Sequence, residues 1–154
     1  MKNSSKFLYL IFIVLGFVFL RSAYGKVMGG VFVSGLGETL TKMASKNPFA
    51  WYKSFLETVA IPNATTFGQL TMWGEVFAGL AIFCSAVYLL LKQNNKIVHI
   101  LLLLGLVVGA FLNGVFWLAA GYTSPSTDGL NLVMFFVELV GIVFVLKSLG
   151  KDGK

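Results

Sequence analysis

Five polar side chains that could do chemistry fall inside long apolar stretches of the chain: Arg21, Lys26, Glu75, Asn113 and Glu138. Ionisable groups at membrane depth are costly, and they usually face the interior of a helix bundle, where they pair, carry protons or bind a substrate. Counted at about 1.5 Å per residue from the ends of their apolar stretches, all five fall in one half of the membrane or near its middle. They are therefore the candidate site.

Two compatible interpretations of these residues are open. In the first, Arg21 and Lys26 neutralise Glu75 and Glu138, and the pairs fix the register of the helices. In the second, the same residues line a buried polar pocket that opens to the outer leaflet or the outer aqueous side. Arg21 and Lys26 would then bind a small anion, while Glu75 or Glu138 moves protons as the catalytic carboxylate.

A quinone acceptor would need aromatic walls near this pocket. A quinone head group requires a proton donor or acceptor inside an apolar slot. Trp73, Phe77 and Phe116 are the candidate walls for this cofactor, and Trp117 could add to them. We expect Asn113 and Trp117 to complete the contacts to the substrate.

The composition indicates a membrane protein. Hydrophobic residues make up 57% of the 154 residues and charged residues only 12%, whereas ordinary soluble domains are about 25% charged. The 12 basic residues are scattered near the ends of apolar stretches, which argues against a nucleic-acid partner. One cysteine, Cys84, allows no internal disulfide or thiolate metal site, and one histidine, His99, cannot supply both axial ligands of a haem. We therefore expect no metal and no haem.

Four apolar stretches predict an all-α membrane protein with four transmembrane helices in a single domain over residues 1–154. None shows the alternation of a strand, and each is long enough to span a bilayer. A helix over 7–36 would be about 45 Å long, so it must tilt, kink at Gly29–Gly30 or project from the membrane. The predicted spans are residues 7–36, 70–91, 97–120 and 130–147.

The first stretch has a second interpretation. Lysines before a 14-residue apolar run, followed by Ala23-Tyr24-Gly25, resemble a signal peptide that would be cleaved near residue 25. An uncleaved helix is favoured because Arg21 fits poorly in such a signal and the apolar pattern resumes after Lys26.

Lysine placement predicts the orientation in the plasma membrane. Basic residues favour the cytoplasmic side, and with four crossings three lysine-bearing segments share one side, so both termini are expected in the cytoplasm. These lysines are Lys2, Lys6, Lys92, Lys96, Lys147, Lys151 and Lys154.

An interfacial helix is predicted on the outer face over residues 48–60. Asn47-Pro48 is typical of a helix start, and the apolar residues that follow at spacings of three and four form one face. They are Phe49, Tyr52, Phe55, Leu56 and Val59.

Several motifs resemble the DoxX/DoxD membrane family. Two short motifs are similar to the family's first two helices, and two longer ones are similar to the DoxD branch in particular. The first pair is Arg21-x-x-x-Gly25 with Phe32-Val33-Ser34-Gly35 and Glu38, and Gly74-Glu75-x-x-x-Gly79; the second is Asn47-Pro48-Phe49-x-Trp51-Tyr52-x-x-Phe55-Leu56 and Asn113-Gly114-x-x-Trp117-x-Ala119-x-Gly121-x-Thr123-Ser124-Pro125-Ser126.

The resemblance covers roughly residues 17–146 and implies a four-helix bundle. The DoxD branch contains the membrane subunit of thiosulfate:quinone oxidoreductase. It thus implies oxidation of thiosulfate, or a related sulfur anion, at the outer face, with membrane quinone as the diffusible electron acceptor. The motif positions that it carries over are Arg21, Gly25, Glu75, Gly79, Asn113 and Trp117.

Three functions are therefore expected to compete. The first is a redox subunit of this kind, working with other membrane or outer-face subunits. The second is a structural or assembly subunit of a respiratory complex, in which the polar pairs serve packing alone. The third is a small transporter or lipid-binding protein, although the paired repeats and broken helices of many transporters are not evident.

Overall fold

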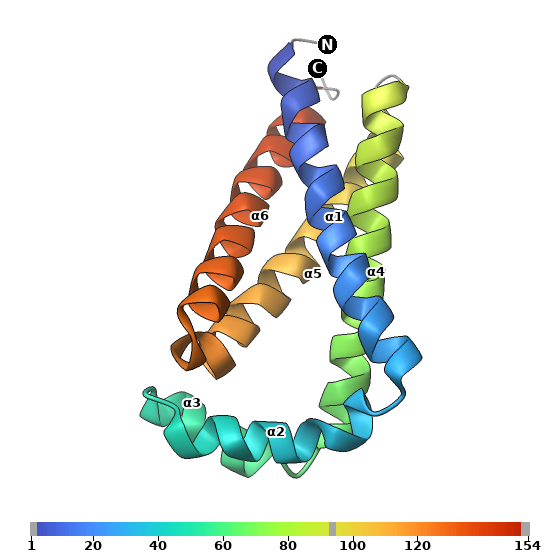
Figure 1. The fold of residues 1–154 in the computed structure, drawn as a ribbon. Coiled ribbons are helices and arrows are strands. Elements are labelled where there is room, and N and C mark those ends of the chain that lie inside the picture. The colour runs from blue at the N-terminus through green and yellow to red at the C-terminus, as the bar shows by residue number, and fades with distance from the viewer. Residues whose placement is uncertain (1–2, 93–94, 152–154) are drawn as a thin grey trace.

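The structure of the protein is a computed structural model that describes residues 3–92 and 95–151. All its regular elements in these ranges are helical (Figure 1). They are α1 (Asn3–Gly29), α2 (Phe32–Lys46), α3 (Ala50–Phe55), the π-helix η1 (Leu56–Ala60), α4 (Ala64–Leu91), α5 (Lys96–Ala120), the 3-10 helix η2 (Gly121–Thr123) and α6 (Pro125–Lys151).

Four of these helices, α1, α4, α5 and α6, are long and apolar enough to cross a membrane. Their outward-facing side chains are apolar as well: Phe111 is 69% exposed and Val133 is 61% exposed. A helix that is apolar on its outer face as well as on its packed face suits a lipid environment. The predicted all-α, four-helix membrane bundle is confirmed.

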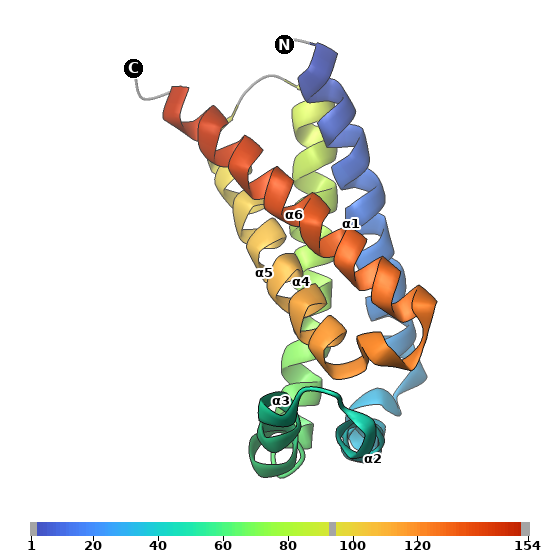
Figure 2. The same ribbon diagram turned by 90° about the vertical axis from the view of Figure 1, so that its left-hand side faces the viewer.

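The bundle is assembled around close helix contacts. Helix α1 packs along α4, α4 along α5, and α5 along α6 (Figures 1 and 2). Helices α1 and α6 meet near the start of α1, where the Tyr9 and Phe12 rings lie 5.8 and 6.4 Å from the Phe144 ring. Small residues allow the closest approaches; a Cβ added to Gly105 would lie 2.9 Å from the Cβ of Ala81.

The single helix predicted over residues 7–36 is divided in two. Helix α1 ends at Gly29, and Gly30 has a φ of +68°, a left-handed conformation that only glycine adopts without strain. The chain then turns into α2, which begins at Phe32. The kink that we considered at Gly29–Gly30 is thus a complete break.

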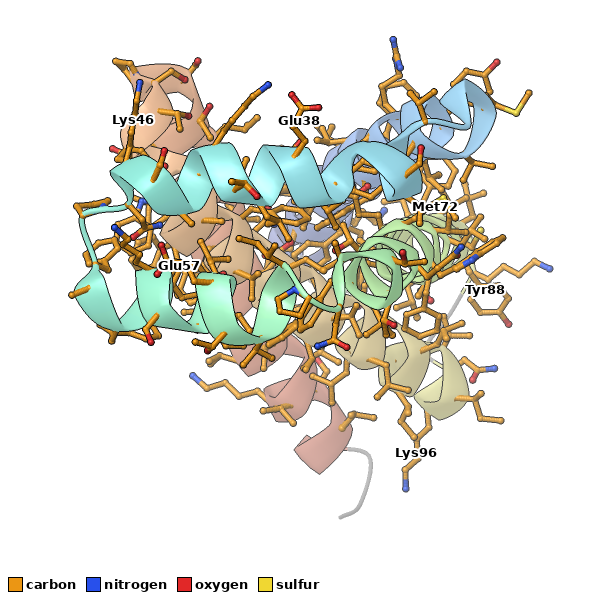
Figure 3. The ribbon with its side chains drawn as sticks, turned by 90° about the horizontal axis from the view of Figure 1, so that it is seen from below. Glu38, Lys46, Glu57, Met72, Tyr88 and Lys96 are labelled. Atoms are coloured by element: carbon orange, nitrogen blue, oxygen red, sulfur yellow. The ribbon has the colours of Figure 1, made fainter. Side chains whose placement is uncertain are left out.

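Helix α2 and the run α3–η1 lie side by side across one end of the bundle, which we call the capped end (residues 31–63; Figure 3). Figure 3 shows Glu38 on the side of α2 that faces away from η1. The helix predicted over 48–60 corresponds to α3 and η1, and α2 beside it is a second helix that the sequence analysis did not separate from the first span. Two hydrogen bonds tie this cap to α5: Asn47 Nδ2 donates to the Leu118 carbonyl (2.9 Å) and Tyr52 Oη donates to the Val115 carbonyl (3.2 Å).

The opposite end of the bundle, which we call the terminal end, carries the start of α1 and the end of α6 (Figure 1). The end of α4 and the start of α5 lie there too. Five of the predicted lysines therefore share this end, while Lys2 and Lys154 lie outside the described residues. The five are Lys6, Lys92, Lys96, Lys147 and Lys151.

Candidate functional site

The first polar pair of the bundle joins α1 to α4. Lys26 Nζ lies 2.6 Å from each carboxylate oxygen of Glu75 and also donates to Ser22 Oγ at 2.9 Å. The Glu75 side chain is 2% exposed and that of Lys26 is 20% exposed. The Lys26 ammonium also stands 5.1 Å from the centre of the Phe32 ring, at a distance where a cation and an aromatic face attract. Of the two ion pairs in the first interpretation, the structure shows this one.

The second polar pair joins α5 to α6 and contains no cation. Asn113 Nδ2 donates to both carboxylate oxygens of Glu138, at 2.9 and 3.0 Å, and both side chains are buried. Gly109 makes the space for this carboxylate, because a Cβ there would lie 2.6 Å from Glu138 Oε1. Glu138 is thus a buried carboxyl group held by an amide, and it forms no ion pair with any residue in the described ranges.

The two pairs are neighbours across α5. Lys26 Nζ lies 5.7 Å from the centre of the Phe116 ring, and Phe116 is three residues, less than one helical turn, from Asn113 on α5. Phe116 therefore stands beside the first pair and close to the second. Lys26, Glu75 and Asn113 lie in the halves of their helices nearer the capped end, and Glu138 lies at the middle of α6.

Arg21 does not join this cluster. Its side chain is exposed on the outer surface of α1, and it makes no ion pair or hydrogen bond with the described part of the chain. The reason is helical geometry: five residues separate Arg21 from Lys26, which turns them roughly 140° apart around the helix axis. The predicted two-cation anion site is not assembled, and the predicted pairing of Arg21 with a carboxylate is absent from these residues.

Trp73 and Phe77 lie away from the cluster too. They are 57% and 42% exposed, and Trp73 Nε1 donates to Gln69 on the same helix at 3.1 Å. Trp73 stands two residues from Glu75, so it points about 160° away from that carboxylate around α4. These two residues face outward, whereas Phe116 lies beside Lys26 and Trp117 beside Asp128.

A pocket of about 430 Å³ opens at the capped end, near the start of α6. The Phe49 and Trp117 rings line it and pack against each other, with ring centres 5.7 Å apart. Trp117 Nε1 donates to Asp128 Oδ1 at 2.6 Å, which places a carboxylate at the pocket. The pocket is an open, aromatic-lined hollow with one acidic group, and its other lining residues are Pro48, Gly121, Tyr122, Thr123, Ser124 and Pro125.

Asp128 is the functional candidate that sequence reasoning missed. It lies in the polar turn before the predicted fourth span. The sequence analysis considered only ionisable residues inside the apolar stretches, so Asp128 was not among the candidates. A usable signal existed, because Asn47-Pro48-Phe49 and the segment from Trp117 to Ser126 both belong to the longer motifs. These two segments are about 70 residues apart in the chain and meet at this pocket.

His99 is a buried hydrogen-bonded residue near the terminal end. Its Nδ1 lies 3.0 Å from the Asn95 carbonyl oxygen, and its Nε2 lies 3.2 Å from Tyr9 Oη. Because a carbonyl can only accept, Nδ1 carries the proton and Nε2 accepts from the tyrosine. His99 therefore links α5 to α1. In the described ranges, no group of three or more His, Cys, Asp or Glu could hold a metal ion.

Replacing Asn113 by leucine is expected to destabilise the bundle by roughly 2 kcal/mol, because Glu138 would lose its amide donor while remaining buried. Thermal unfolding of the purified protein in detergent micelles measures this loss. The double variant Asn113→Leu/Glu138→Leu removes both polar groups and should recover most of it. Equal stability of Asn113→Leu and the wild type would contradict the assignment.

Comparison with protein-family models, with curated proteins and with solved structures finds no match to this chain.

Proposed function

We propose that the chain is the membrane subunit of a quinone-linked oxidoreductase of the DoxX/DoxD kind. It would lie in the plasma membrane with both termini in the cytoplasm and the capped end outside. The observation that carries the proposal is the pocket at the capped end, because aromatic rings can pack against a quinone and a carboxyl group can exchange the protons of its reduction. The Phe49 and Trp117 rings line the pocket, and Asp128 is its acidic group.

The chemistry assigned to this pocket is reduction of quinone to quinol. Oxidation of two thiosulfate ions to one tetrathionate releases two electrons, and the quinone takes up these electrons together with two protons. Asp128 stands at the pocket to exchange a proton with the ring oxygen. Glu138 is a second carboxyl group, about 15 Å further along α6, and Asn113 holds it in place.

The sulfur anion requires a site other than the predicted one formed by Arg21 and Lys26. Lys26 is engaged by Glu75, Arg21 lies on the outer surface of α1, and a carboxylate rather than a cation stands at the pocket. We therefore assign oxidation of the anion to a partner at the outer face, and reduction of the quinone to this chain. In this assignment Lys26 and Glu75 position α1 against α4.

Asp128→Asn is expected to weaken binding of decylubiquinol, the product of decylubiquinone reduction, about tenfold. The quinol hydroxyl donates to the carboxylate, and a hydrogen bond to a charged group contributes roughly 1.5–3 kcal/mol. Quenching of tryptophan fluorescence by the quinol, in nanodiscs without oxygen, gives the dissociation constant. Phe49→Ala should weaken binding as well, whereas Trp73→Phe is the matched control on the outward face and should leave it unchanged.

If Asp128→Asn and Phe49→Ala leave the dissociation constant unchanged, or if Trp73→Phe raises it as much as they do, the pocket is not the binding site. With co-purified partners, thiosulfate-dependent reduction of the same quinone then tests the whole reaction. Absence of that turnover in an assembled, quinone-binding complex would overturn the choice of thiosulfate.

A structural or assembly role is the second candidate, and the engagement of Glu75 favours it. A carboxylate held at 2.6 Å by Lys26 on the neighbouring helix suits a packing function. In that case Glu75→Gln would lower stability or assembly and leave turnover per assembled complex unchanged.

A further inference from the structure

Helix α1 has one face that packs in the bundle and one that nothing in the described chain covers. The packed face contains Tyr9, Phe12, Leu15, Phe19 and Ala23, all of which are buried. One stripe of the outward residues recurs at alternating spacings of three and four, a line along which a helix can pack against another. Its residues are Phe7, Leu10, Val14, Phe17, Arg21, Tyr24 and Met28, which we call the outer seam of α1.

Arg21 sets this seam apart from an ordinary lipid-facing surface. It lies eight residues before the end of α1 at Gly29, roughly 12 Å along the helix axis. Side chains in a helix lean toward its N-terminus, so Arg21 leans away from the nearer membrane surface. A guanidinium in this position is costly in lipid, and such groups almost always pair with an acid or a carbonyl.

The partner of Arg21 is not another copy of this chain. Two copies that met through the outer seam would bring two Arg21 side chains together, which is unfavourable. A copy that presented another face would offer no free carboxylate at this depth. Every described carboxylate is buried in the bundle or engaged: Glu75 by Lys26, Glu138 by Asn113, Glu38 by Lys42, Glu57 by Lys53 and Asp128 by Trp117.

Two glycines beside Arg21 fit the approach of a foreign helix. Gly25 and Gly29 are four residues apart, and a Cβ added to either would meet nothing within 4 Å. By contrast, a Cβ on Gly16, toward the packed side, would lie 2.6 Å from the backbone nitrogen of Phe83. Small residues four apart let a second membrane helix approach closely, and no residue in the described ranges is such a neighbour of Gly25 and Gly29.

We propose that the outer seam of α1 binds a transmembrane helix of a different protein, which places an aspartate or glutamate opposite Arg21. Gly25 and Gly29 lie beside this contact, and the apolar residues of the seam pack along the rest of it. The proposal does not depend on quinone chemistry, because the contact is read out by cross-linking and not by turnover.

The test uses the whole protein in nanodiscs with a poly-leucine transmembrane peptide that carries one glutamate at the depth of Arg21. A single cysteine at Val14 or Tyr24, in a Cys84→Ser background, reports contact with a cysteine in the peptide. We expect disulfide formation at the seam to fall about tenfold when the peptide glutamate is glutamine or when Arg21→Gln is introduced. A peptide with lysine should restore it for Arg21→Glu. Val107→Cys, on the exposed side of α5, is the matched control position and should react little.

Three results would overturn the proposal. Cross-linking that is equal for the glutamate and glutamine peptides would show that charge does not select the partner. Cross-linking between copies of the protein itself through Val14 would make the seam a self-association surface. If disulfide formation at the seam required anionic lipid in the nanodisc and did not require the peptide carboxylate, Arg21 would be assigned to a lipid head group. In native membranes, cross-links from Val14 and Tyr24 to an identified membrane helix bearing an acidic residue, lost in Arg21→Gln, would name the partner.

Discussion

Replacing Lys26 by methionine is expected to destabilise the bundle by roughly 3 kcal/mol, because removal of one partner leaves an uncompensated buried charge. Glu75 is 2% exposed and receives Lys26 on both of its oxygens, so no solvent replaces the lost ammonium. The converse variant, Glu75→Gln, should cost less, since Lys26 is 20% exposed and lies within one turn of the end of α1, where its ammonium can move toward water.

The double variant Lys26→Met/Glu75→Leu separates the ion pair from packing. A buried ion pair replaced by apolar side chains is often neutral or stabilising, so this variant should be more stable than Lys26→Met alone. Thermal unfolding of the wild type, Lys26→Met, Glu75→Leu and the double variant in the same detergent gives a double-mutant cycle. A coupling energy near zero would mean that the pair contributes nothing, and would also remove its role in positioning α1 against α4.

Replacing Gly16 by leucine is expected to cost about 3 kcal/mol, at the upper end of the usual range for overpacking. A Cβ at Gly16 would lie 2.6 Å from the backbone nitrogen and 2.9 Å from the Cα of Phe83. Backbone atoms of α4 cannot rotate away as a side chain can, so the two helices must separate along their contact. Loss of the folded fraction in nanodiscs, or a fall in the unfolding temperature, measures the effect.

Gly25→Leu is the matched control for this prediction. It makes the same substitution on the same helix, but nothing lies within 4 Å of the added Cβ, so the stability of the isolated protein should change by less than about 0.5 kcal/mol. If Gly25→Leu were as damaging as Gly16→Leu, the clash with Phe83 would not be the cause. In the peptide assay, by contrast, Gly25→Leu should weaken the contact at the outer seam.

The transmembrane architecture could be predicted from the sequence alone, because it depends on local quantities. Length and hydropathy decide whether a helix can cross a bilayer. The lysine positions predict which connecting segments and termini share a side of the membrane. The boundaries were less well determined. The helix predicted over 7–36 ends at Gly29 because Gly30 takes a left-handed backbone, and a hydropathy pattern does not record backbone conformation.

The candidate residues for the site could also be found from the sequence, since ionisable groups inside apolar stretches are conspicuous. Their partners were decided by the tertiary structure, because helix rotation sets which side chains meet. Lys26 turns toward Glu75 while Arg21, five residues earlier, turns outward. Glu138 receives the amide of Asn113 and not a guanidinium because α6 packs against α5, and Gly109 leaves room for its carboxylate. The pocket with Asp128 exists only where the cap meets the ends of α5 and α6, a contact between segments about 70 residues apart that no local pattern encodes.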